Sequence, residues 1–256
     1  MGKHEPLTHS RCHPERSASG VPYAQRANGV SVGKDLRLFF APSPFRLISA
    51  LASPLDTKTM FRLARPTPNE IELEVSDAQG RLPDCPRLLS RTSGLQAQLP
   101  ILFAHDRVRS LIGHGKASFN GAKKAFEQWE LFNLGWVGVA NPDASITVGQ
   151  IVVVKAHTLG LWSFNLSQIV ETISLPTQFG FIYSTTDRHV EQGEERFLIE
   201  LDEKTNEVWY DIEAVSRPRQ TLARIGLPFT RYFQHQFARD SHRKMRVVVQ
   251  SPNTAP

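Results

Sequence analysis

The sequence predicts an α+β domain in which a curved antiparallel sheet of about six or seven strands packs on a long C-terminal helix. After Gly135 the apolar residues recur with a period of two, as expected of half-buried strands. The links between these strands are short, which favours antiparallel pairing because parallel strands need a long crossover. From Gln220 to Val248 the apolar spacing becomes helical, and this stretch is suited to cover the apolar face of the sheet.

The first 59 residues differ in composition from the rest of the chain. They contain Gly, Pro, Ser and Arg without a period, which predicts a disordered leader. The leader has eight Lys or Arg against four Asp or Glu, so most of the formal net charge of +5 belongs to it and a nucleic-acid partner is not expected. A foldable pattern opens at Met60, which suggests that translation starts there; the alternative is a genuine disordered extension. We expect one domain over residues 60–249 and a disordered tail over 250–256.

Two helical segments are predicted before the sheet. The stretch TPNE at 67–70 is typical of a helix start, with Pro early and an acid in the first turn, and this helix is expected to end by Gly80. Residues 118–132 predict a second helix, because their apolar residues recur at spacings of three and four. Residues 88–94 are interpreted as a short strand, whereas 99–113 is ambiguous.

Six strand patterns follow the second helix. They lie at 136–140, 150–158, 162–173, 179–183, 197–201 and 208–214. In the third of them, the apolar residues expected on one face are Trp162, Phe164, Leu166 and Val170. The link DEKTN at 202–206 is short enough for a hairpin turn. Gly226 and Pro228 interrupt the closing helical stretch, so a short helix or turn is expected before a longer helix that starts at Pro228.

A sheet wrapped round one helix leaves a cavity between them. This order of elements resembles the helix-grip arrangement of START and Bet v 1-like proteins, which implies a ligand space under the helix. The alternative architecture is a closed antiparallel barrel plugged at one end by a helix.

Four segments carry a closer resemblance to a known family. They read FEQWELFNLGW (126–136), FGFIYSTTDRHVEQGEERF (179–197), VWYDIEAVSRPR (208–219) and LPFTRYFQHQF (227–237). In this order they resemble the DUF1990 (UPF0548) family, over about residues 60–249. One departure is the stretch 184–186, which reads Ser-Thr-Thr where the family pattern tends to have Gly-Thr-Leu. The family has no assigned reaction, so the resemblance implies boundaries and candidate positions but no activity.

A polar cluster between two strand patterns marks the candidate ligand site. His189, Glu194 and Glu195 lie on either side of Gly193, a residue that permits a tight turn. Adjacent strand residues point to opposite faces, so at most one of the two glutamates faces a cavity and the other is expected to meet solvent. A His–Glu pair is suited to acid–base chemistry. The alternative is a solvated hairpin loop.

Four residues on neighbouring strands complete the predicted ligand-binding set. Tyr183 and Tyr210 lie on the apolar-looking face, where each hydroxyl needs a partner, either a ligand or a core group. Ser216 and Arg217 end the last strand pattern. Arg217 could reach Glu194 or an anionic group of a ligand, or form a structural salt bridge.

These features predict a protein that binds a small hydrophobic or amphipathic molecule between the sheet and the C-terminal helix. One alternative is an enzyme of hydrolase, cyclase or isomerase type that uses Tyr183, His189 and a glutamate. Another is a module that binds a partner or a membrane surface through the basic side of the C-terminal helix. No metal-ligand, phosphate-loop or nucleophile-elbow motif occurs, so neither a metal nor a cofactor is predicted. Cys12 and Cys85 form no disulfide or zinc framework, which suggests a reducing, cytoplasmic location.

Overall fold

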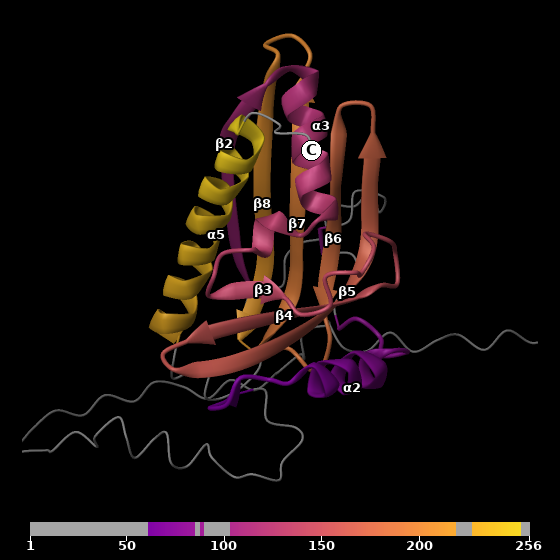
Figure 1. The fold of residues 1–256 in the computed structure, drawn as a ribbon, viewed down its shortest axis with the longest axis vertical. Coiled ribbons are helices and arrows are strands. Elements are labelled where there is room, and N and C mark those ends of the chain that lie inside the picture. The colour runs from indigo at the N-terminus through magenta and orange to yellow at the C-terminus, as the bar shows by residue number, and fades with distance from the viewer. Residues whose placement is uncertain (1–60, 85–87, 90–102, 219–226, 252–256) are drawn as a thin grey trace, which may run out of the picture.

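The computed structural model describes residues 61–84, 88–89, 103–218 and 227–251 (Figure 1). The predicted leader, the start at Met60 and most of the strand expected at 88–94 lie outside the described residues. Residues 252–256 also lie outside the described residues. Of the tail expected over 250–256, only the first two residues are described, and Gln250 is the last residue of a helix.

The strands form one antiparallel sheet. They are β1 (Phe61–Arg62), β2 (Ala104–His114), β3 (Val137–Val139), β4 (Ile151–Thr158), β5 (Leu161–Leu175), β6 (Gln178–Thr185), β7 (Glu191–Asp202) and β8 (Glu207–Pro218). Seven of them pair in the order β2-β8-β7-β6-β5-β4-β3, and β1 pairs with β5. This confirms the curved antiparallel sheet. Within the described residues β2 and β3 are the two ends of the path, so the sheet is an open half-barrel rather than the closed barrel of the alternative prediction.

The helices agree with the predicted order and differ in their ends. They are α2 (Pro68–Ala78), α3 (Gly115–Glu127), the short 3-10 helix η2 (Glu130–Phe132) and α5 (Leu227–Gln250). The predicted start of α2 is confirmed, because Thr67 and Glu70 form a capping box. The second helix ends before Phe132, since Trp129 adopts a left-handed backbone with φ of 58°. Over its described range, α5 runs without a break from Leu227.

The ambiguous stretch before α3 is a strand. β2 pairs with β8 along its whole length and forms one edge of the sheet. Its outward residues Arg107 and Arg109 form ion pairs with acids of β8 and β7, while Val108 faces the inner side. Charged residues on the outer face leave few apolar residues in this strand, which explains why its period of two was weak in the sequence.

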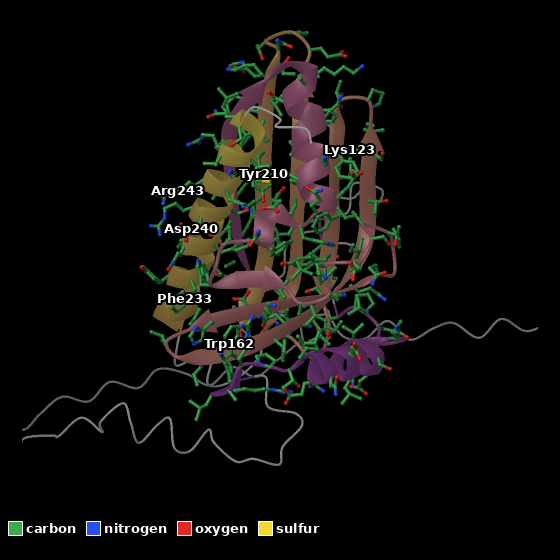
Figure 2. All side chains as sticks on the ribbon, viewed as in Figure 1. Lys123, Trp162, Tyr210, Phe233, Asp240 and Arg243 are labelled. Carbon is green, nitrogen blue, oxygen red and sulfur yellow. The ribbon has the colours of Figure 1, made fainter. Side chains whose placement is uncertain are left out.

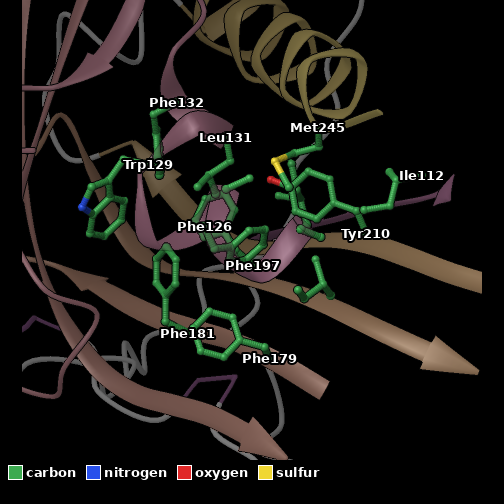
Figure 3. Close-up of a cluster of buried hydrophobic side chains, with 14 of the residues drawn as sticks. Ile112, Phe126, Trp129, Leu131, Phe132, Phe179, Phe181, Phe197, Tyr210 and Met245 are labelled. Atoms are coloured by element: carbon green, nitrogen blue, oxygen red, sulfur yellow. The ribbon is translucent and has the colours of Figure 1, made fainter. Parts of the chain in front are cut away.

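An aromatic cluster fills the inner face beneath α3 (Figure 3). Phe126 of α3 lies edge-on to three rings of the sheet, with centroid distances of 6.2 Å to Phe179, 6.1 Å to Phe181 and 5.6 Å to Tyr210. Such edge-to-face pairs add to the free energy gained from burying the rings. Phe126 is fully buried, and this half of the inner face is therefore a packed core.

The outer face has a smaller core beneath α2. Ala78, Ile71 and Val75 of α2 pack against the apolar side chains of β4 and β5. Phe164 and Leu166 share one face of β5, as predicted, but they belong to this outer core rather than to the face that α5 covers. The inner face of β5 carries Ser163 and Asn165 instead.

In the part of the chain that the structure describes, α3 as well as α5 covers the inner face. α3 packs over β6, β7 and β8 near the β7–β8 hairpin, and α5 packs against β2, α3 and η2 (Figure 1). The first turns of α5 extend toward β3 and β4, beyond the end of α3. The space between these turns and the sheet is where the candidate site lies. This is a helix-grip architecture in which α3 fills one half of the grip.

Candidate functional site

A cavity of about 490 Å³ lies between the inner face of the sheet and the first turns of α5. Its walls are mainly apolar and come from β2, β3, β4, β8, η2 and α5; they include Val108, Phe132, Val137, Val154, Ala156, Ile212, Phe237 and Ala238. The cavity is also lined by two exposed residues, Leu159, which is 68% exposed, and His235. The mouth of the cavity therefore lies beside these two residues. The volume is within the range of small-molecule sites.

Strand β7 brings carboxyl groups into this cavity. Residues 191, 193 and 195 lie on the same face of the strand as Phe197, which is part of the inner core. The inward residues of β7 in the cavity wall are therefore Glu191, Gly193 and Glu195.

Gly193 allows β7 and β8 to approach each other closely. A Cβ atom built on it would lie 2.0 Å from the carbonyl oxygen of Val215, so no side chain fits there. The sequence suggested a tight turn at this glycine. It lies instead inside β7, opposite Ser216, and is not among the residues with positive φ. The turn precedes β7, at residues 186–190.

Glu195 lies in the middle of a row of residues that crosses the sheet. Its neighbours in the row are Ala214 on β8 and Tyr183 on β6, and Asp106 on β2 follows Ala214. The Tyr183 hydroxyl donates a hydrogen bond to Glu195 Oε2 at 2.5 Å. Burial raises the pKa of Glu195 to about 7, although the bond from Tyr183 acts in the opposite direction. Burial and the nearby Glu195 carboxylate raise the pKa of Tyr183 well above its usual value.

A second polar group lies nearer the mouth, around Glu191. The side-chain amide of Gln234 on α5 donates to both carboxylate oxygens of Glu191, at 2.7 and 2.8 Å, and lies 3.4 Å from Ser216 Oγ. Arg231 of the same helix pairs with Asp106 of β2. Burial raises the pKa of Glu191 to about 7, against the lowering effect of the bonds from Gln234 and Ser216. These contacts tie the first turns of α5 to the cavity rim.

His189 borders the cavity and pairs with no carboxylate of the described residues. Its Nδ1 accepts a hydrogen bond from the backbone N–H of Glu191 at 3.0 Å. Nδ1 therefore bears no proton, and in the neutral ring the proton is on Nε2. Burial lowers the pKa of His189 to about 4, so the ring is neutral at neutral pH.

The two adjacent glutamates make different contacts, as their strand geometry requires. Glu195 bonds Tyr183, whereas Glu194 Oε2 accepts the backbone N–H of Leu89 at 2.6 Å. Glu194 also borders the cavity, but it is only 2% exposed. The expectation that one of the pair meets solvent is therefore wrong, because Glu194 is buried and accepts a hydrogen bond from Leu89.

Tyr210 and Arg217 do not line the cavity. The Tyr210 hydroxyl lies 2.9 Å from Ser241 Oγ of α5 inside the packed core, so it is a satisfied core hydroxyl. Arg217 lies on the opposite face of β8 from Ser216; its Nε donates to Gln192 and its guanidinium lies 5.0 Å from the ring centroid of Phe103. It reaches neither Glu194 nor the cavity.

Five of the seven candidate residues therefore border one space. They are Tyr183, His189, Glu194, Glu195 and Ser216. The predicted ligand-binding set omitted Glu191, which belongs to the same acidic cluster of the sequence, and Gln234. Glu191 could have been found from its spacing of two from Gly193 and of six from Phe197, an inward residue. Gln234 had no such signal, because its place depends on how α5 docks.

The basic residues of α5 are largely engaged by acids of the same domain. Arg231 pairs with Asp106, and Lys244 Nζ lies 2.7 Å from Glu130 Oε2. Arg239 lies beside Asp240, while Arg243 points away from the sheet (Figure 2). No helix in the described ranges has the length and apolar character needed to cross a bilayer. The same residues contain no group of three or more His, Cys, Asp or Glu placed to hold a metal ion.

Comparison with known sequences yields one family and several relatives. The model of a family described as "Domain of unknown function (DUF1990)" matches residues 90–244. A UPF0548 protein of Dictyostelium discoideum is 34% identical over 162 residues, which cover 58% of this chain and 74% of that protein. A UPF0548 protein of Arabidopsis thaliana is 32% identical over 145 residues, with 54% and 70% covered.

Among solved structures, the chain is similar to Ara h 8.0201 and to ginseng major latex-like protein 151 from Panax ginseng. Each is 12% identical and has a TM-score of 0.39. The match to Ara h 8.0201 covers 59% of this chain and 99% of that one. The match to the ginseng protein covers 58% and 99%.

Proposed function

This chain belongs to the DUF1990 family, and on that premise we propose that it binds a small amphipathic molecule in the cavity between the sheet and α5. The observation that carries the proposal is a space of about 490 Å³ with apolar walls and a few inward polar groups. Apolar walls give a ligand affinity, and a small number of placed polar groups orient it.

Small residues keep this space open. Gly193, Ala214 and Ser216 line it from β7 and β8, Ala156 from β4 and Ala238 from α5. Filling a cavity with larger apolar side chains commonly stabilises a protein. Small residues on four different elements around one space therefore support a role in binding rather than in stability alone.

The neutral dye N-phenyl-1-naphthylamine, whose fluorescence increases in apolar surroundings, tests this proposal. We expect one dye molecule to bind each folded chain. The variant Ala156→Phe should weaken binding at least about tenfold, because the phenyl group occupies the ligand space. The matched control is Val148→Phe, since Val148 is 64% exposed and does not line the cavity. Dye binding that is absent, or that Ala156→Phe leaves unchanged, contradicts the proposal.

A second candidate function is an enzyme that uses the same cavity, favoured by the pKa of Glu195. A carboxyl group with a pKa of about 7, bonded to a phenol, is suited to transfer protons near neutral pH. If the protein is an enzyme, Glu195→Gln should accumulate bound substrate. Native mass spectrometry of molecules that co-purify with the wild type and with this variant would then show two different compounds. Identical compounds in both would count against catalysis by Glu195.

A further inference from the structure

The described residues that line the cavity include four acids and no Lys or Arg. Among the described lining residues, the acids are Asp106, Glu191, Glu194 and Glu195. Asp106 is paired with Arg231, and Glu194 accepts a backbone N–H. Glu191 and Glu195 accept hydrogen bonds from neutral groups, the amide of Gln234 and the hydroxyl of Tyr183. Ionised carboxylates in apolar surroundings are unfavourable unless a positive charge lies nearby.

Glu195 is the acid that is best placed to meet a ligand. Its Oε2 holds the Tyr183 hydroxyl, and within the described part of the chain its Oε1 has no hydrogen-bond partner. Its neighbour across β8 is Ala214, whose small side chain leaves space beside the carboxylate. The side chain is enclosed by protein yet keeps some accessible surface, because that surface faces the cavity. This enclosure also raises the pKa of Glu195, since burial without a nearby cation disfavours the charged form of a carboxyl group.

Other groups in the cavity also favour a ligand that donates hydrogen bonds. Asn165 lines the cavity, and its buried Oδ1 has no hydrogen-bond partner among the described residues, so a rotation of this side chain would offer a second acceptor. The rings of Phe132, Trp136 and Phe233 line the cavity too, and aromatic faces attract cations. His189 is neutral and adds no positive charge that would attract an anion.

We propose that the ligand is a hydrophobic amine whose protonated nitrogen donates to Glu195 Oε1 and whose apolar body lies against the aromatic and aliphatic walls of the cavity. This inference rests on the proposed binding function and names the class of ligand. An ammonium group forms a charge-assisted hydrogen bond and neutralises the buried carboxylate at once. A hydroxyl group of the same size provides the bond without the charge, and a carboxylate ligand is repelled.

Three probes with the same ring system test this choice: 2-naphthylmethylamine, 2-naphthylmethanol and 2-naphthoate. Each is used to displace N-phenyl-1-naphthylamine at about pH 8, where Glu195 is mainly ionised. We expect the amine to bind about tenfold to a hundredfold more tightly than the alcohol, and the naphthoate to bind most weakly. This ranking is measured on the wild-type protein and needs no variant.

The variant Glu195→Gln assigns the preference to its residue. It should bind the amine and the alcohol with similar affinity and still bind the neutral dye, which also reports that the variant is folded. The matched control is Glu127→Gln, an exposed residue of α3 outside the cavity, which should keep the wild-type ranking.

The outcomes separate this inference from the function on which it rests. If neither the dye nor any probe binds, the binding function itself fails. If the dye and the alcohol bind but the amine does not bind more tightly than the alcohol, or the naphthoate binds most tightly, the proposed amine ligand is wrong while the binding function stands. A preference for the amine that persists in Glu195→Gln overturns the assignment to Glu195.

Discussion

The two halves of the inner face of the sheet share strands β6, β7 and β8 but differ in the size and polarity of their side chains. Beneath α3 these strands present Phe181, Phe197, Ile199 and Tyr210, and the half is packed solid. Beyond α3 the same strands present residues such as Thr185, Gly193, Glu195, Ala214 and Ser216, and the half is hollow. Whether a half-barrel holds a core or a cavity thus depends on side-chain volume, not on the course of the backbone.

The two buried tyrosines, Tyr210 and Tyr183, also differ between the packed half and the hollow half. Tyr210 in the packed half shares a hydrogen bond with a neutral hydroxyl of Ser241, whose side chain is fully buried. Tyr183 in the hollow half donates to a carboxylate whose remaining surface faces the cavity. A buried hydroxyl is therefore structural in one half and part of a titrating, ligand-facing group in the other.

The largest difference between the halves is expected from removing a large side chain. Phe126→Ala in the packed half should lower the free energy of unfolding by about 3–5 kcal/mol, because it leaves a cavity among rings that cannot close over it. Phe237→Ala at the cavity wall should cost about half as much, since that ring already borders open space. Urea denaturation of both variants measures the two values. Equal losses would contradict the comparison.

Adding side-chain volume should have opposite effects in the two halves. Ala122 is fully buried in α3, so Ala122→Leu should destabilise the protein by between about 1 and 3 kcal/mol through overpacking. Ala156→Leu adds the same atoms to the cavity wall and should leave stability unchanged or increase it by about 1 kcal/mol. Thermal or urea unfolding of the two variants measures both changes in stability. A comparable loss in Ala156→Leu would mean that the hollow half is rigidly packed.

The hollow half should also make stability depend on pH. The pKa of Glu195 rises from 4.5 to about 7 on folding, so the folded state binds more protons between these values. Its favourable contribution is complete below about pH 4.5 and is lost as pH rises through about 7. The wild type should therefore lose on the order of 2 kcal/mol relative to Glu195→Gln between about pH 4.5 and 8.

Glu191 and His189 titrate in both of these proteins, so the difference between the two unfolding free energies reports Glu195 together with its charge coupling to Glu191. A difference that stays constant over this range of pH would show that Glu195 is not buried as a carboxyl group. Urea unfolding at several pH values provides the measurement.

The smallest effect is expected from the tyrosine hydroxyls. Tyr210→Phe should cost about 1 kcal/mol at every pH, because it leaves the buried Ser241 hydroxyl without this partner. Tyr183→Phe should cost about 1 kcal/mol more at pH 8 than at pH 5, because the hydrogen bond is stronger to an ionised carboxylate than to a protonated one. A cost of Tyr183→Phe that does not vary with pH would contradict the charged pairing with Glu195.

Much of the fold could be predicted from the sequence because its elements follow local rules. The capping box at Thr67 and the period of two in β4 to β8 are each encoded within a few residues. The prediction was weakest where tertiary contacts replace local signals. β2 is defined by its pairing with β8, and the end of α3 by the left-handed conformation of Trp129.

The candidate site, like the fold, was predictable from the sequence only in part. The polar cluster and the strand order selected candidate residues, and five of them border one cavity in the structure: Tyr183, His189, Glu194, Glu195 and Ser216. Alternation along a strand also separates Glu194 from Glu195, as their different partners reflect. The contacts that each residue makes with distant segments are not encoded locally, as the hydrogen bond from Leu89 to the buried Glu194 shows.

The sequence by itself determined the kinds of elements, their order and the presence of acids among apolar strands, because periodicity and turn chemistry act between near neighbours. The tertiary structure alone decided which face of β5 meets α2, that α3 fills half of the grip, and that Gln234 of α5 meets Glu191 of β7. These outcomes depend on how whole elements dock, and docking is governed by volumes and charges that lie far apart along the chain.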